Sequence, residues 1–197
     1  LTANLGEVFA IFSSAFTGLL PITAIQLLWV NFITDIFPAA ALGTDPPAPN
    51  IMKQKPRGRD ERIIDKRWAL LVGAIATKKA IVTLALFFAI YWSTGSLIQA
   101  QSISFTWVVL SHFVRISAVR AEEGIPFFSN KWVTISLVFS AVLQLAILYT
   151  PMAILFDVRA PTLTEWALLI IAMVVGRWLA IYMTKKIVEM TPKDWQA

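Results

Sequence analysis

The sequence contains no cysteine, a single histidine and few charged side chains. The absence of cysteine excludes disulfides and thiolate metal sites, and one histidine cannot build the imidazole sets typical of zinc or copper. Charged residues make up 15% of the 197 residues, whereas hydrophobic residues make up 57%, and the mean hydropathy is +0.69. This balance predicts an integral membrane protein whose first partner is the lipid bilayer.

Phosphate-binding motifs are also absent. The sequence has no glycine-rich phosphate loop, and the segments between its apolar runs are too short for a nucleotide-binding domain, so we expect no ATP hydrolysis by this chain alone. The net charge of +5 does not indicate nucleic acid, because the basic residues punctuate apolar runs instead of forming a basic face on a soluble domain. The first apolar run begins at residue 1 without a methionine, which predicts a fragment.

Long apolar runs are the main positive feature of the sequence. A membrane-spanning helix needs about 20 largely apolar residues to cross a hydrocarbon core about 30 Å thick. The sequence offers six such runs, at residues 1–19, 22–42, 68–92, 103–119, 132–149 and 166–183. They are continuous and rich in Leu and Ala, unlike the short alternating strands of a membrane barrel. We therefore predict an all-α membrane protein, a bundle of six transmembrane helices in a single domain over residues 1–197.

Lysine and arginine are distributed unequally between the two sides of this predicted bundle. Twelve of them fall on one side, at residues 53–67, at residues 120 and 131 and in the tail from residue 185, whereas the other side has only Arg159. The positive-inside rule makes the basic side cytoplasmic, and an even number of crossings places both chain ends there. The proline-rich connection at residues 44–67 is predicted to be a cytoplasmic loop, either a solvated segment or a docking surface for another domain.

Two polar clusters interrupt the first two apolar runs. Asn4 and Glu7 lie in the first run, and Asn31, Thr34 and Asp35 lie in the second. An ionised carboxylate in a bilayer interior is costly unless it pairs, lines water or holds a cation, so the two acidic residues indicate function. Spacings of three and four residues place the oxygens of each cluster on a common side of its helix.

The short turn at residues 18–21 predicts that these two helices are antiparallel neighbours, with both clusters level near the membrane midplane. Two carboxylates and several neutral oxygens suit a hard cation such as Ca²⁺. Pro38, which follows the second cluster, is expected to loosen its helix and free backbone carbonyls near the site. The alternative is that Asn4, Asn31 and Thr34 serve only as interhelical hydrogen-bonding groups.

The second run also carries a resemblance to a known family. The string QLLWVNFITD at residues 26–35, continued by residues 38–43 and 46–57, resembles the sixth transmembrane helix and following loop of P-type calcium pumps. The segment NLGE at residues 4–7 resembles the fifth helix, and the later runs are spaced like the last four. The resemblance covers essentially the whole chain and implies the carboxy-terminal transmembrane half, the fifth to tenth membrane helices, of a P-type cation-transporting ATPase.

This resemblance implies that the transported ion is Ca²⁺. Its partners would be four amino-terminal membrane helices and the cytoplasmic domains, which hold ATP, Mg²⁺ and the phosphorylated aspartate outside this sequence. The alternatives are a P-type pump for Na⁺ or Mn²⁺ and, from another class, a secondary cation exchanger or a structural membrane bundle. The implied metal ligands are Asn4, Glu7, Asn31, Thr34 and Asp35.

His112 departs from the resemblance. It occupies the eighth-helix position at which the sarcoplasmic reticulum type of calcium pump has a coordinating glutamate, and an imidazole is a poor Ca²⁺ ligand. Arg115 lies one turn further along, and Lys78 and Lys79 lie near the midplane of the preceding run. We predict these four as possible counterion or proton-exchange groups. The alternative is that the lysines snorkel or pair with carboxylates and that the histidine only packs.

Overall fold

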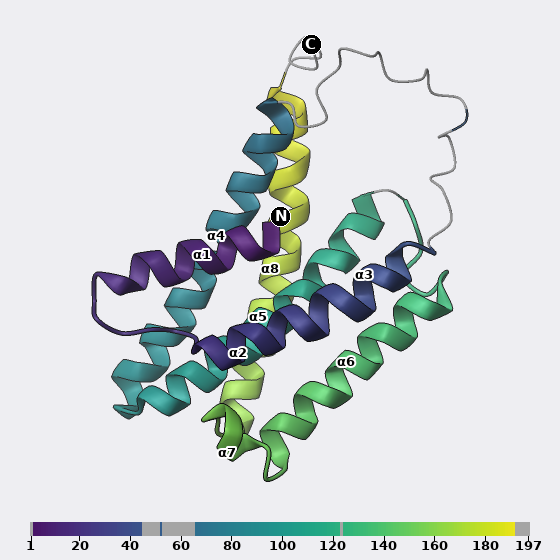
Figure 1. The fold of residues 1–197 in the computed structure, drawn as a ribbon. Helices are drawn as coiled ribbons and strands as arrows, with labels where there is room; N and C mark the ends of the chain where they lie inside the picture. Colours follow the sequence, from purple (N-terminus) through teal and green to yellow (C-terminus); the bar gives the residue numbers. More distant parts are fainter. Residues whose placement is uncertain (1, 45–51, 53–65, 123, 192–197) are drawn as a thin grey trace.

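The computed structural model describes residues 2–44, 52, 66–122 and 124–191, and its secondary structure there is helical, as the sequence predicts (Figure 1). Three short pieces form the second predicted run, in which a π-helix separates two α-helices. The helices are α1 (Thr2–Ala15), α2 (Ala24–Asn31), η1 (Phe32–Ile36), α3 (Phe37–Leu42), α4 (Lys66–Thr94), α5 (Leu97–Glu122), α6 (Lys131–Tyr149), α7 (Ala153–Phe156) and α8 (Leu163–Met190).

Five helical segments among the described residues are long and apolar enough to span a membrane: the continuous α2–η1–α3 rod, α4, α5, α6 and α8. The 14 residues of α1 extend only ~21 Å, so the predicted count of six spans is not confirmed. The predicted cytoplasmic loop at residues 44–67 lies mostly outside the described residues. Its placement, and that of both chain ends, stays a prediction.

The connection between α1 and α2 is longer than the sequence predicts. The helix ends at Ala15 instead of residue 19, and Gly18 adopts a φ of 71°, which only glycine enters without strain. Pro21 then favours extended backbone before it. Thr23 opens α2 as its N-cap, since its hydroxyl accepts from Gln26 N and the Gln26 side chain accepts from Thr23 N.

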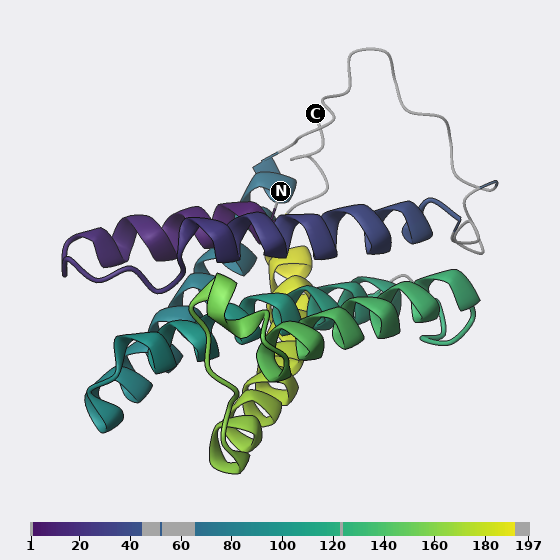
Figure 2. The same cartoon turned by 60° about the horizontal axis from the view of Figure 1, so that its bottom comes forward.

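The first two helices do not pack together as predicted. Within the part of the chain that the structure describes, α1 packs mainly along α4, whereas the α2–η1–α3 rod packs on α5 and α6. Both views show that the chain reverses its direction after α1 and that the rod then runs beside α6 (Figures 1 and 2). The connection at residues 16–23, a turn followed by irregular backbone, is long enough for the rod to pack away from α1.

The connection between the predicted runs 68–92 and 103–119 is shorter than their bounds indicate. Only Gly95 and Ser96 separate α4 from α5, because Gly95 takes a φ of 69° and the Ser96 hydroxyl accepts from Gln99 N to start the next helix. The polar residues that suggest a loop are buried and hydrogen-bonded instead. Gln99 Nε2 donates to Glu165 Oε1 at 2.5 Å, and the backbone N of Arg159 donates to Ser102 Oγ at 2.8 Å.

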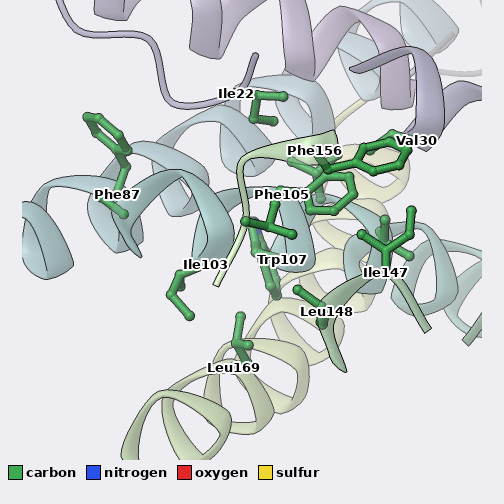
Figure 3. Close-up of a cluster of buried hydrophobic side chains, with 14 of the residues drawn as sticks. Ile22, Val30, Phe87, Ile103, Phe105, Trp107, Ile147, Leu148, Phe156 and Leu169 are labelled. Carbon is green, nitrogen blue, oxygen red and sulfur yellow. The ribbon is translucent and has the colours of Figure 1, made fainter. Parts of the chain in front are cut away.

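The hydrophobic core is centred on α5. Phe105, Trp107, Val108 and Val109 are each at most 1% exposed, and they meet side chains from α2, α4, α7 and α8 (Figure 3). Burying a side chain of this size stabilises a fold by about 1.5–3 kcal/mol in water. In a bilayer this term is smaller, so close packing and hydrogen bonds hold the helices together.

Hydrogen bonds join the helices at the two ends of the bundle. At one end Gln26 Nε2 donates to Phe156 O at 3.0 Å, which joins α2 to α7, and Gln101 Nε2 donates to Leu20 O at 2.9 Å, which joins α5 to the residues before α2. At the other end Asn130 Nδ2 donates to Thr44 Oγ1 at 3.1 Å, which ties the start of α6 to the residues after α3. The second polar cluster lies on the rod between these two ties.

Candidate cation site

Glu7 is buried between three helices. It lies on the face of α1 that packs on α4, it is 3% exposed, and its Oε1 accepts a hydrogen bond from Lys79 Nζ at 2.8 Å. Lys79 is 6% exposed and also donates to Ala3 O, one turn before Glu7, at 3.1 Å. The costly carboxylate is therefore paired with an equally buried ammonium. The sequence prediction that an intramembrane acid needs a partner is consistent with this geometry.

His112 approaches the same carboxylate from α5. Its Nδ1 lies 2.8 Å from Val108 O, which fixes the ring, and its Nε2 lies 3.7 Å from Glu7 Oε1 without a hydrogen-bond partner. Of the four predicted counterion candidates, Lys79 and His112 are thus the two that converge on Glu7. Lys78 Nζ instead donates to Gly176 O on α8 at 2.9 Å, and Arg115 Nη1 lies 3.5 Å from Glu122 Oε1.

Gly6 makes the close approach of α1 and α4 possible. A Cβ at this position would lie 2.9 Å from Lys79 Cδ and 3.1 Å from the backbone oxygen of Ala76. The lysine stem therefore occupies the volume that a larger residue would need. The sequence prediction missed Gly6, although a glycine directly before a buried acid is a signal for close helix packing.

The second polar cluster lies where the rod departs from α-helical geometry. The π-helix η1 covers Phe32–Ile36, and Pro38 follows in the first turn of α3. Proline has no backbone N–H, so a carbonyl in the preceding turn loses its usual donor. Ser140 Oγ on α6 donates to Ile33 O at 3.2 Å. The loosened helix predicted around Pro38 is thus present, and Ser140 is a second residue that the sequence did not single out.

The predicted ligands of this cluster differ in their surroundings. Asn31 Oδ1 is buried and has no hydrogen-bond partner, whereas Thr34 is buried and its hydroxyl donates to Val30 O at 2.8 Å. Only the backbone of Asp35 is described, as part of η1. Asn4 on α1 is exposed, so it does not share the buried face of Glu7 as its spacing predicts. No hydrogen bond or ion pair joins the two clusters among the described side chains.

A small cavity lies beside the Glu7 cluster. It has a volume of about 30 Å³, and its lining includes Ala3, Lys79, Trp107, Ser111 and His112. A space of this size holds one or two water-sized groups when polar partners are available. Ser111 and the backbone of Ala3 supply oxygen atoms, and two buried donors or acceptors at its wall, Trp107 Nε1 and His112 Nε2, have no partner. The α1, α4 and α5 junction therefore holds a small, mostly apolar cavity with a few polar groups in its lining.

Comparison with known proteins now assigns the family. Residues 19–187 match the family model described as "Cation transporting ATPase, C-terminus". The chain belongs to this family. It is 28% identical over 196 residues to Calcium-transporting ATPase 1 of Bacillus cereus, covering 89% of this chain and 22% of that protein. A Calcium-transporting ATPase of Bacillus subtilis is 31% identical, with 86% of this chain and 20% of the relative covered.

A third relative is eukaryotic. The Endoplasmic reticulum calcium ATPase srcA of Aspergillus fumigatus is 38% identical over 132 residues, which cover 66% of this chain and 13% of that protein. The chain spans about a fifth or less of the length of these relatives. The carboxy-terminal membrane region of a P-type cation ATPase is thus the confirmed identity of this multi-pass membrane protein, and membership of this family speaks against a secondary exchanger or a purely structural bundle.

Proposed function

We propose that the chain is the ion-conducting membrane domain of an ATP-driven pump that transports Ca²⁺, with Asn4, Glu7, Asn31, Thr34 and Asp35 as ligands. The observation that carries this proposal is the unpartnered, buried Oδ1 of Asn31 in the turn before η1. A buried amide oxygen without a donor is costly unless something else binds it. A hard cation that prefers amide, carbonyl and carboxylate oxygens meets that need.

The π-helix supports the same proposal. Discontinuous helices with irregular backbone are where membrane transporters bind ions, because such turns expose carbonyl oxygens that a regular helix keeps paired. Here η1 carries Thr34 and Asp35, and the chain is similar to proteins whose names state calcium transport. We infer that the cation takes ligands from both η1 and α1. Access to it would alternate when the ATP- and Mg²⁺-dependent cytoplasmic domains of the parent pump move.

Replacing the central carboxylate tests the proposal in the full-length pump that contains this chain. Asp35→Asn keeps the size of the side chain but removes the charge that offsets cation dehydration. We expect the Ca²⁺ concentration for half-maximal phosphorylation from ATP to rise by about 100-fold or more. The matched control is Asp157→Asn, the same change at an exposed residue whose φ of 49° asparagine tolerates.

Separate outcomes test the assignment of the ligands and the identity of the transported ion. Wild-type Ca²⁺ dependence in Asp35→Asn would refute the ligand assignment, whereas an equal loss in Asp157→Asn would attribute the effect to general destabilisation. The same titration with Mn²⁺ and Na⁺ tests the transported ion, because oxygen ligands alone discriminate weakly among hard cations. A pump activated by either ion and not by Ca²⁺ would contradict the calcium assignment.

A further inference from the structure

The ion pair between α1 and α4 is built into the helix packing. Lys79 Nζ contacts two acceptors on one face of α1, Glu7 Oε1 at 2.8 Å and Ala3 O at 3.1 Å. The stem of the lysine runs against Gly6, where any Cβ would come within 3.1 Å of both Lys79 Cβ and Lys79 Cδ. Ala3, Gly6 and Glu7 therefore form a seat on α1 for one ammonium group.

An ammonium in this seat excludes a second cation from the same carboxylate. Protein oxygens bind Ca²⁺ at about 2.3–2.6 Å, so a metal on Glu7 would lie within a few ångströms of Lys79 Nζ. Both charges are buried, and repulsion between like charges is strong where water is scarce. His112 Nε2, at 3.7 Å from Glu7 Oε1, already restricts another side of this oxygen. Glu7 thus binds either Lys79 or the transported cation.

The adjoining cavity gives the ammonium somewhere to go. Lys79 lines the space of about 30 Å³ between α1, α4 and α5, together with Ala3 and Ser111. The volume suits one or two water-sized groups, and Lys79 reaches it by rotating its side chain. Arg115 lines the same cavity, so its positive charge disfavours a long stay of the ammonium there and returns Lys79 to Glu7 when the metal leaves.

We propose that Lys79 is a tethered cation that competes with the transported cation for Glu7, so that each loading of the pump must break the Lys79–Glu7 ion pair. The inference rests on the proposed function, because it takes Glu7 as a ligand of the transported ion. It assigns Lys79 a regulatory role: the lysine sets the apparent cation affinity of the site and neutralises Glu7 between transport cycles.

Neutralising the competitor tests this inference in the full-length pump. Lys79→Gln removes the charge but retains a donor for Glu7, so we expect the Ca²⁺ concentration for half-maximal phosphorylation to fall about tenfold. Lys78→Gln removes the same charge one residue away, where the side chain contacts Gly176 instead of Glu7, and should shift the value less than about threefold. The phosphoenzyme level at saturating Ca²⁺ reports whether each variant folds. If the Lys79→Gln variant cannot be purified, Lys79→Met is used instead, because its unbranched side chain also fits the space beside Gly6.

A double-mutant cycle shows whether the effect acts through Glu7. Adding Lys79→Gln to Glu7→Gln should bring no further gain in Ca²⁺ affinity, since the contested carboxylate is gone. The inference is overturned if Lys79→Gln shifts the affinity no more than Lys78→Gln, or if its gain persists in the Glu7→Gln background. Either result would mean that the Lys79–Glu7 ion pair only stabilises the helix packing. A wild-type pump without Ca²⁺-dependent phosphorylation would instead overturn the proposed function, and the inference with it.

Discussion

Gly6→Ala is the sharpest test of the packing that holds the ion pair. The new methyl group would lie 2.9 Å from Lys79 Cδ and 3.1 Å from the Ala76 carbonyl oxygen. The lysine stem can bend, but the carbonyl belongs to the backbone of α4, so the two helices must move apart. Overpacking of this kind costs about 1–3 kcal/mol. Alanine recovers about 1 kcal/mol through its higher helix propensity, which leaves a net loss of up to about 2 kcal/mol.

Gly73→Ala is the matched control on α4. A Cβ at Gly73 would meet no described atom within 4 Å, so this variant gains the helix propensity of about 1 kcal/mol without a steric cost. The two variants should therefore differ by about 1–3 kcal/mol in stability. Heating the purified full-length pump and measuring the remaining monodisperse protein ranks their apparent midpoints. A Gly6→Ala midpoint at or above that of Gly73→Ala would refute the close α1–α4 contact.

Two further predictions concern the ion itself. Pro38→Ala restores a backbone N–H to the rod and should favour a regular helix across η1, raising the Ca²⁺ concentration for half-maximal phosphorylation about tenfold without loss of membrane insertion. An unchanged concentration would make Pro38 a tolerated kink. Because Lys79 and His112 both face Glu7, we also expect one Ca²⁺ bound per phosphorylation site in equilibrium ⁴⁵Ca binding. Two ions per site would contradict that charge argument.

The fold class follows from the sequence because its apolar runs are long and continuous, which permits only helices in a bilayer. The ends of the helices are harder to predict from the sequence where polar residues have partners far away in the chain. Gln99 resembles a loop residue by composition, yet its side chain binds Glu165, 66 residues away, and accepts from Arg159 Nη1 at 3.0 Å. Local composition cannot reveal such a partner. The connection at residues 16–23 was missed for a different reason, since a glycine and a proline mark a break without giving its length.

Some features of the candidate site can also be predicted from the sequence, and others cannot. The cost of a buried carboxylate singles out Glu7 from sequence alone, and Pro38 locates the irregular turn. Helical spacing does not tell which side of a helix is covered, so Asn4 and Glu7 have opposite exposures although they lie three residues apart. The choice of Lys79 over its neighbour Lys78 depends on a contact across 72 residues and on the space beside Gly6. That choice requires the packed helices.

The distribution of hydrogen bonds indicates where the bundle is free to change. The α2–η1–α3 rod is tied at one end through Gln26 to Phe156 and at the other through Thr44 to Asn130. Between these ties, η1 has irregular backbone geometry, the Asn31 oxygen just before it is unpartnered, and Ser140 on α6 donates to the Ile33 carbonyl. A helix with fixed ends and one loosened turn changes most easily at that turn, because the remaining hydrogen bonds stay intact. On the α1 side the corresponding adjustable contact is the Lys79–Glu7 pair, which a rotating lysine can open without moving a helix. A cation that bound both η1 and Glu7 would therefore couple a change in the η1 turn to the opening of the Lys79–Glu7 pair, while the hydrogen-bonded ends of the rod stay in place.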